Sequence, residues 1–216
     1  MTTPSNQHTE KSIFRVQGGQ PLHGSVRIGG AKNASYKILI ASLLCNAAQA
    51  ESRLLNFSHI SDVHLVADIV RYLGGSVNQA GERALFVDPT QMHAAEIDPE
   101  HGEQGRFSTM FIPPLVHRFG KAIVPAPGGD KIGKRPLDRH FDGLRSLGIE
   151  VEMKHGNYVA TAEQVTGAEY RFAKNTHTGT ETMIMAAARA DRAICAFGDV
   201  HFARPGQAQG RAVQIV

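Results

Sequence analysis

The sequence feature that most constrains the fold is a segment that occurs twice. Asp68 to Gly74 and Asp142 to Gly148 share aspartate, arginine, leucine and glycine at a constant shift of 74 residues. A weaker recurrence sets Ser108-Thr109-Met110 against Glu181-Thr182-Met183. Self-similarity at a fixed period is typical of chains that repeat one supersecondary unit. We therefore predict repeated α/β units.

Apolar spacing and turn residues predict the elements of the first unit. The helix that begins at Ser61-Asp62, with these residues as its cap, carries Val63, Val66, Ile69, Val70 and Leu73 on one face and ends at Gly74-Gly75. The other predicted elements are strands at 12–16 and 24–28, a helix after Gly29-Gly30-Ala31-Lys32-Asn33 that is buried on most sides, a strand at Leu54-Leu55, hairpin arms at Val77 and 84–87, and a polar surface connection at 91–105.

The second unit repeats this order. A helical run from Arg106 contains Pro113-Pro114, which should kink it or confine it to a few turns. The remaining predictions are a strand at 122–124, a helix that carries Phe141, Leu144 and Leu147, and hairpin arms at 149–153 and 158–161. A third unit that begins near Thr180 has only 36 residues left, and 198–216 show no periodicity from which a helix or hairpin can be predicted.

These elements predict how the chain is divided. The expected parts are a disordered N-terminus (1–11), N-terminal strands (12–28), a first repeat unit (29–105), a second repeat unit (106–179), and an incomplete third unit with an atypical tail (180–216).

Composition excludes several classes of protein. With 42% hydrophobic and 20% charged residues the chain can bury a core. The net charge of +3 is mild and the cations are dispersed, so we expect no nucleic-acid partner. No stretch has the roughly 18 uninterrupted apolar residues of a membrane span. Two isolated cysteines favour a reducing compartment, and we expect a cytoplasmic protein. The eleven histidines show no ligand spacing, so we expect no metal site and no cofactor.

The segment from Pro127 to Asp138 is suited to hold an anion. It contains three glycines, which allow a ligand to approach the backbone closely, and the cations Lys131, Lys134 and Arg135. These cations can donate charge-assisted hydrogen bonds to a phosphate or a carboxylate. Asp130 directly precedes these cations, either as a counter-ion or as a reacting group.

Three blocks of the sequence carry a resemblance to a known family. Gly29-Gly30-Ala31-Lys32-Asn33-Ala34, Arg106, and the segment from Pro127 to Asp138 resemble the signatures of the UDP-N-acetylglucosamine enolpyruvyl transferases, and the resemblance extends from about Phe14 to Ala190. It implies an inside-out α/β barrel of two domains, each of three repeated units, with the active site between them, in a chain roughly twice as long. The implied reaction moves the enolpyruvyl group of phosphoenolpyruvate to the sugar 3′-hydroxyl and releases phosphate, the first step of peptidoglycan synthesis.

The resemblance also implies roles for individual residues. Lys32 and Asn33 contact phosphoenolpyruvate, and Arg135 lies near its phosphate. The implied contacts of the UDP-sugar are Arg106, Arg135, Pro136, Leu137, Asp138, Arg139, Lys174, Asn175, Thr176 and His177. The implied catalytic residues are Lys32 and Asp130. Most relatives have cysteine as the acid at the latter position, so aspartate there implies resistance to fosfomycin, which alkylates the thiol.

Several alternatives stay open at this point. Asp138 could be the N-cap of the helix that follows, and Thr176, Thr178 and Thr180 could merely cap theirs. The chain could be a non-catalytic UDP-sugar-binding fragment or paralogue, since no residue is assigned to the family's second domain. We expect little turnover by the isolated chain, and self-association through the incomplete unit. A shikimate-phosphate enolpyruvyl transferase is disfavoured because that relative prefers serine where this sequence has Asn33.

Overall fold

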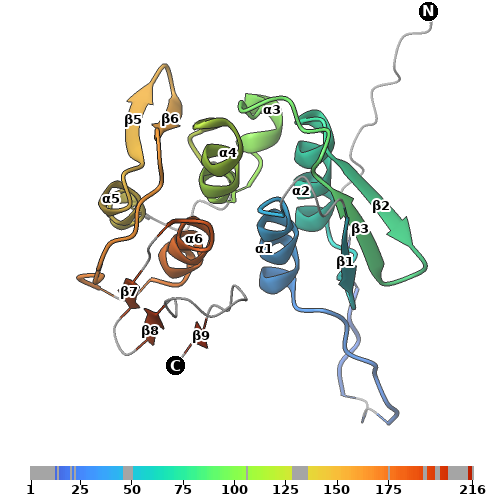
Figure 1. Ribbon diagram of the computed structural model, residues 1–216. Helices are drawn as coiled ribbons and strands as arrows, with labels where there is room; N and C mark the ends of the chain where they lie inside the picture. The colour runs from blue at the N-terminus through green and yellow to red at the C-terminus, as the bar shows by residue number, and fades with distance from the viewer. Residues whose placement is uncertain are drawn as a thin grey trace, which may run out of the picture.

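A computed structural model describes most of the chain. The described residues are 13, 15–19, 21, 23–45, 51–105, 107–127, 136–174 and 176–191, with the backbone alone of 194–197, 200–203 and 214–215. Helices α1 (Lys32–Ser42), α4 (Ile112–Phe119) and α6 (His177–Ala187) lie in the middle of the protein, and the strands lie around them (Figure 1).

The first unit forms a three-stranded sheet covered by helices. Strand β1 (Ser52–Leu55) pairs with β3 (Ala84–Asp88), which pairs with β2 (Ser76–Ala80), and all pairs are antiparallel. Helix α2 (Ser61–Tyr72) packs between this sheet and α1 (Figure 1). The five apolar residues predicted for the inner face of α2 are buried, which confirms that prediction.

The second unit has the same strand order. After the 3₁₀ helix η1 (Ser108–Phe111) and α4 come β4 (Lys121–Pro125), α5 (Asp138–Ser146), β5 (Glu150–Lys154) and β6 (Asn157–Thr161). The antiparallel sheet β4-β6-β5 repeats the order β1-β3-β2. The helices, strands and hairpins predicted for both units are thus confirmed, apart from the corrections given below.

One set of hydrogen bonds explains the 74-residue recurrence. In each unit an arginine in the last turn of the outer helix donates to an aspartate one turn earlier and to a backbone carbonyl of the next strand. This arginine therefore fixes the helix to the first strand of the hairpin. The donor and acceptor residues are Arg71 with Asp68 (2.7 Å) and Val77 (2.7 Å), and Arg145 with Asp142 (3.1 Å) and Val151 (3.0 Å).

The glycine of the recurrent segment ends the helix. Gly74 has φ +93° and Gly148 has φ +81°, a left-handed conformation that glycine adopts without the strain of a side chain. The weaker recurrence also has a structural basis, because Thr109 and Thr182 are both buried among the inner helices.

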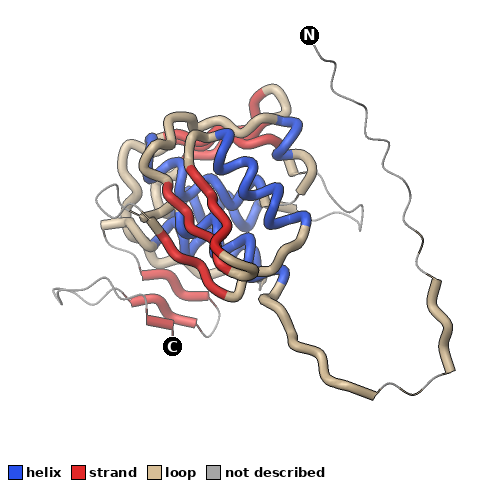
Figure 2. Tube along the Cα trace, turned by 90° about the vertical axis from the view of Figure 1, so that its right-hand side faces the viewer, coloured by secondary structure: helices blue, strands red, loops and turns tan. Residues whose placement is uncertain are grey.

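The N-terminal strands predicted at 12–16 and 24–28 are wrong for the residues that the structure describes there. These residues form no strand, and Ile13, Val16, Val26 and Ile28 are 86–89% exposed. An alternating apolar pattern forms a strand only where it finds a partner strand and an apolar surface to cover. The described part of this segment runs away from the body of the protein (Figure 2).

Two other predictions need correction, and a third is confirmed in one of its two alternatives. The connection at 91–105 is not wholly a surface loop, since Met92 and Ile97 are buried, Glu96 bridges to Ile123 in parallel and 99–102 form the short helix α3 (Pro99–Gly102). The proline pair lies in the first turn of α4 (Ile112–Phe119), where the missing N–H groups cost no hydrogen bond, so of the two predicted outcomes the confinement to a few turns is confirmed and the kink is not. Ile38 on α1 is half exposed, so this helix is buried on fewer sides than predicted.

The last part of the chain contains strands that the sequence did not predict. The backbone of β7 (Ile194–Phe197) pairs with β8 (Val200–Ala203), and β8 pairs with β9 (Gln214–Ile215). Both pairings are antiparallel. Short strands of this kind depend on their neighbours, which a search for periodicity in one segment does not detect.

No helix in the described part of the chain is both long and apolar enough to cross a membrane.

Helix α4 holds the C-terminal ends of the other two inner helices. Its His117 donates from Nε2 to the carbonyl of Ala186 at the end of α6 (2.7 Å), and Arg118 donates to the carbonyls of Leu43 and Cys45 just after α1 (3.3 and 3.2 Å). Helix ends leave backbone carbonyls without intrahelical partners, so these two side chains satisfy groups that would otherwise be buried unpaired. Burial lowers the pKa of His117.

The lowered pKa of His117 predicts a loss of stability in acid. The unfolded chain binds a proton at His117 near pH 6.5, and the folded chain does so only at lower pH. The free energy of unfolding therefore keeps its full value above the ordinary pKa and decreases as pH falls below it, because protonation then favours the unfolded chain. We expect the difference in melting temperature between about pH 7.5 and about pH 5.5 to be smaller in His117→Gln, whose amide can still donate to the carbonyl. Equal pH dependence in both proteins, measured by thermal unfolding, would contradict this role.

Candidate active site

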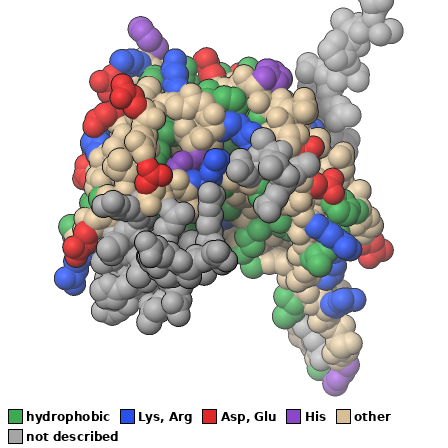
Figure 3. All heavy atoms as spheres, in the orientation of Figure 1, with side chains coloured by type: hydrophobic (Ala, Val, Ile, Leu, Met, Phe, Trp, Pro, Cys, Tyr) green, Lys and Arg blue, Asp and Glu red, His purple; other side chains and the backbone are tan. Residues whose placement is uncertain are grey.

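A cleft lies over the N-terminal ends of several helices. Its volume is about 820 Å³, and it is bordered by the first turns of α1, α5 and α6 and by the residues around η1. Lys, Arg and His side chains lie near the middle of the face drawn in Figure 3. The lining residues are Lys32, Asn33, Tyr36, Lys37, Asp62, Gln104, Gly105, Phe107, Thr109, Pro136, Leu137, Arg139, His140, Thr176, His177, Thr178 and Glu181.

The position of the cleft favours anions. The N-terminal end of a helix carries a partial positive charge and backbone N–H groups without intrahelical acceptors. Helices α1, α5 and α6 direct such ends to one cleft, and Lys32, Lys37 and Arg139 add full charges. The arrangement can bind phosphate or carboxylate groups.

The turn before α1 requires glycine. A Cβ on Gly30 would lie 2.1 Å from the carbonyl oxygen of Asn56, so no larger residue fits without a shift of the backbone. This close packing fixes the point at which α1 begins, and with it the place of Lys32 and Asn33 at the cleft.

Seven of the predicted site residues line the cleft: Lys32, Asn33, Pro136, Leu137, Arg139, Thr176 and His177. They come from three distant parts of the sequence. Lys174 is exposed just before α6 and is not among the lining residues. Arg106, Asp130, Arg135 and Asn175 fall outside the described residues, so their predicted roles stay predictions.

Lys32 is paired with Asp62 in the cleft. The distance from Lys32 Nζ to Asp62 Oδ2 is 3.0 Å, and the lysine side chain is largely exposed. The sequence predicted Ser61-Asp62 as the cap of α2, but the N-cap is Ile60 and no side chain caps this end. The carboxylate binds the lysine of the neighbouring helix instead of the backbone of its own. It therefore holds Lys32 toward the cleft.

A second ion pair crosses the cleft. Lys37 on α1 and Glu181 on α6 are joined by a contact of 2.6 Å, and Tyr36 lies beside them with its ring 5.7 Å from that of Phe107. Burial, and secondly the negative charges of Glu181 and Asp62, raise the pKa of Tyr36. Its hydroxyl therefore stays protonated and can donate a hydrogen bond.

The sequence did not predict Tyr36, Lys37, Asp62 and Glu181 as residues of the site. Part of the signal was present, because residues four apart lie on one face of a helix. Tyr36 follows Lys32 at this spacing, as Lys37 follows Asn33 and Glu181 follows His177. The ion pairs themselves join residues far apart in the sequence and leave no local pattern.

His140, which is buried, and Thr178, which is exposed, form a contact at the side of the cleft. His140 is 6% exposed, and its Nε2 lies 2.9 Å from the hydroxyl of Thr178. The contact joins the first turns of α5 and α6, which also pack along their length. It holds the α5 and α6 sides of the cleft together.

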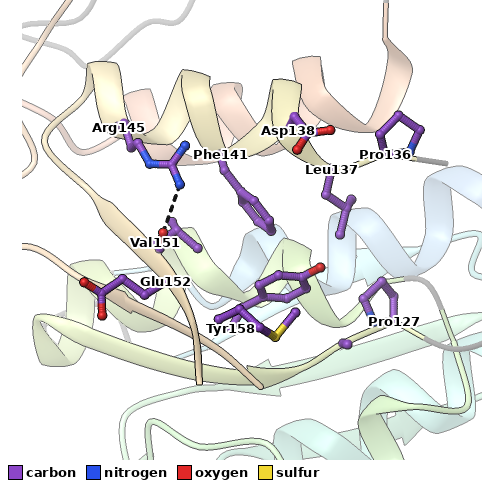
Figure 4. A pocket seen from close by; sticks show the side chains of 11 residues that line it. Pro127, Pro136, Leu137, Asp138, Phe141, Arg145, Val151, Glu152 and Tyr158 are labelled. Atoms are coloured by element: carbon purple, nitrogen blue, oxygen red, sulfur yellow. Dashed lines mark hydrogen bonds between the residues drawn. The ribbon is translucent and has the colours of Figure 1, made fainter. Parts of the chain in front are cut away.

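Asp138 points into a second, adjacent pocket. This pocket of about 510 Å³ lies between α5 and the β5–β6 hairpin, where the rings of Phe141 and Tyr158 are 4.6 Å apart (Figure 4). Burial and the charge of Asp138 raise the pKa of Tyr158. Asp138 is the first residue of α5, whose N-cap is Leu137 without a side-chain cap, so the capping alternative for Asp138 is wrong.

Neither hollow offers a cluster of ligands for a metal ion. Among the described residues, no group of three or more His, Cys, Asp and Glu side chains is arranged to hold one.

The chain is similar in sequence to known enzymes. The model of the family "EPSP synthase (3-phosphoshikimate 1-carboxyvinyltransferase)" matches residues 16–202. A UDP-N-acetylglucosamine 1-carboxyvinyltransferase of Sorangium cellulosum is 41% identical over 177 residues, which are 82% of this chain and 41% of that protein. The enzyme of the same name from Coxiella burnetii is 40% identical over 82% of this chain and 40% of its own length. The chain thus spans about two fifths of the length of these relatives.

Solved structures show the same fold. The enolpyruvyl transferase NikO from Streptomyces tendae has a TM-score of 0.68 at 20% identity, over 82% of this chain and 41% of that one. EPSP synthase from Acinetobacter baumannii has a TM-score of 0.64 at 15% identity, over 86% of this chain and 41% of its own. The prediction of repeated α/β units of the EPSP synthase-like type is confirmed.

Thr176 caps α6, so the capping alternative is confirmed for this residue. Its hydroxyl accepts a hydrogen bond from the backbone N–H of Gly179 at 3.2 Å. We expect Thr176→Ala to lower the free energy of unfolding by about 1 kcal/mol and Thr176→Ser to preserve it, because serine also caps helices. Urea unfolding of the two variants measures the difference, and equal losses in both would show that the hydroxyl contributes nothing as a cap.

Proposed function

The chain belongs to the EPSP synthase (3-phosphoshikimate 1-carboxyvinyltransferase) family, and from this premise we propose that its cleft binds UDP-N-acetylglucosamine and phosphoenolpyruvate for enolpyruvyl transfer. The phosphoenolpyruvate enolpyruvyl group would move to the sugar 3′-hydroxyl with release of phosphate. One observation carries the proposal: residues implied for the two substrates, from three distant segments, line one cleft at the positive ends of helices. We assign the reaction to the cytoplasm and to the first committed step of peptidoglycan synthesis.

The geometry suits two anionic substrates. Lys32 and Asn33, in the first turn of α1, would hold phosphoenolpyruvate, while Arg139, Thr176 and His177 on the α5 and α6 side would hold the UDP-sugar. Both substrates carry several negative charges, which repel one another in water. Fixed cations and helix ends offset this repulsion, which is an electrostatic contribution to the transfer. They also keep the reacting groups close to each other, which is a contribution of positioning.

Asp130 is proposed as the acid that protonates the methylene carbon of phosphoenolpyruvate. An aspartate has a reference pKa of about 3.9, against about 8.5 for a cysteine, and the cations that follow it in the sequence favour its charged form. It becomes a competent acid when water leaves the site and substrate phosphates neutralise these cations. A carboxylate also offers fosfomycin no thiol to alkylate, which supports the expected resistance.

The sequence favours the UDP-sugar over shikimate phosphate as the acceptor of the enolpyruvyl group. Relatives named as UDP-N-acetylglucosamine 1-carboxyvinyltransferases are 36–41% identical to this chain. Asn33 after Lys32 also disfavours shikimate phosphate. Because the match covers about two fifths of those relatives, binding of the UDP-sugar and transfer to it are separate questions for this chain. Binding without transfer is the second candidate function. Self-association stays a prediction.

The proposal is tested by two measurements on the purified chain. Calorimetric titration with UDP-N-acetylglucosamine should show binding that is weakened about tenfold or more in Arg139→Gln, since a charge-assisted hydrogen bond contributes about 1.5–3 kcal/mol. It should be unchanged in Asp68→Asn, a matched change in an exposed ion pair on α2. A coupled phosphate assay with both substrates then separates transfer from binding. Binding of shikimate 3-phosphate in preference to the UDP-sugar would contradict the proposed substrate.

The role of Asp130 has its own test. In the protein that shows phosphate release, Asp130→Asn should reduce turnover by a factor of about 10²–10⁴, the usual contribution of a general acid. Its affinity for UDP-N-acetylglucosamine should stay within about twofold, because the amide removes the proton and not the site. Full turnover by this variant would refute the assignment.

A further inference from the structure

The ion pair between Lys37 and Glu181 connects two walls of the cleft. Lys37 Nζ lies 2.6 Å from Glu181 Oε1, and the side chains are only 16% and 33% exposed. The lysine belongs to α1 and the glutamate to α6, 144 residues later. Each lies about one helical turn inside the cleft from a predicted ligand-binding residue of its own helix, Asn33 and His177.

This pair is poorly satisfied as a stabilising contact. Glu181 Oε2 is buried, and no hydrogen-bond donor reaches it within the described part of the protein. Taking two charges out of water costs several kcal/mol per ion, and their attraction offsets this only when the remaining atoms are also bonded. In comparable cases an apolar pair of similar volume is equally stable or more stable. Stability therefore does not account for Lys37 and Glu181.

The surrounding packing shows what the pair adds. Helix α6 packs chiefly against α5 and α4, and α1 packs chiefly against α2, while both also touch η1. The ion pair adds a direct bond between α1 and α6 at the cleft. The cation–π contact of Lys37 with Tyr36, at 5.7 Å, further restricts the lysine.

We propose that Glu181 is a positioning residue, which through Lys37 sets the separation of α1 and α6 so that the groups at their N-terminal ends hold the sugar nucleotide and the phosphoenolpyruvate side by side. The ligands named here rest on the proposed function, whereas the separation of the helices does not. The free energy lost by leaving Glu181 Oε2 without a hydrogen bond is then the cost of holding the cleft walls at one distance.

Two double variants separate this role from a structural one. Lys37→Met with Glu181→Leu replaces the pair by apolar side chains, and Lys37→Glu with Glu181→Lys reverses it. We expect the apolar variant to keep or raise the melting temperature but to bind UDP-N-acetylglucosamine at least tenfold more weakly. The reversed variant should recover part of the affinity because it restores the bond. Asp68→Asn, which changes an exposed pair that is not among the lining residues of the cleft, is the matched control.

A second measurement needs no ligand. Spin labels at Ile38→Cys on α1 and Lys174→Cys before α6, both exposed sites, report the separation of the two helices by pulsed electron paramagnetic resonance. The background carries Cys45→Ser and Cys195→Ser. We expect the apolar variant to broaden or shift the distance distribution relative to this background.

The outcomes are distinct. Unchanged affinity in the apolar variant, or an affinity loss that only follows a fall in melting temperature, overturns the proposal. An unchanged distance distribution in the apolar variant also overturns the proposal, whether or not the parent chain binds the UDP-sugar. If the parent chain does not bind UDP-N-acetylglucosamine but the distribution broadens, the proposed substrate fails while the positioning role of Glu181 stands.

Discussion

The structure depends on the way helix α4 satisfies the ends of its two neighbours. His117 and Arg118 donate to carbonyls at the C-terminal ends of α6 and α1, so the three inner helices end on the same side. Their N-terminal ends therefore also lie on one side, which is where the cleft is found. A few hydrogen bonds at one end of the protein thus determine that positive helix ends gather at the other.

The same constraint explains why acids occur in a cleft suited to anions. Lys32 and Lys37 would repel each other and the helix ends if they stood alone, and each is held by a carboxylate from another helix, Asp62 and Glu181. These carboxylates keep the lysines oriented in the ligand-free protein. An incoming phosphate or carboxylate group can then exchange with Asp62 at the exposed Lys32, which is already in place, and this avoids the entropic cost of ordering a long side chain on binding.

The sequence predicted the parts of this architecture that local patterns encode. The apolar face of α2 and the glycine stops were readable, and the paired segments around Arg71 and Arg145 identified the repeat because the same hydrogen bonds are made twice. The predictions from sequence failed where the structure of a segment depends on a residue or strand far away in the chain. The N-terminal segment has the alternation of a strand but no partner strand among the described residues, and Asp62 binds a lysine of another helix instead of capping its own. The resemblance found seven cleft residues but not the pair that joins α1 to α6.

The second pocket refines what adjacent site residues can do. Pro136 and Leu137 border both hollows, but Arg139 lines the cleft and Asp138 lines the pocket beside Phe141 and Tyr158. Neighbouring residues at the start of a helix point about 100° apart, so a sugar nucleotide in the cleft cannot meet both side chains from one side. If Asp138 contacts the ligand as the resemblance implies, the contact is made by its backbone or by a part of the ligand that reaches the second pocket. Pro136 and Leu137 border both hollows, so the residues of this one sequence motif make contacts in two different places.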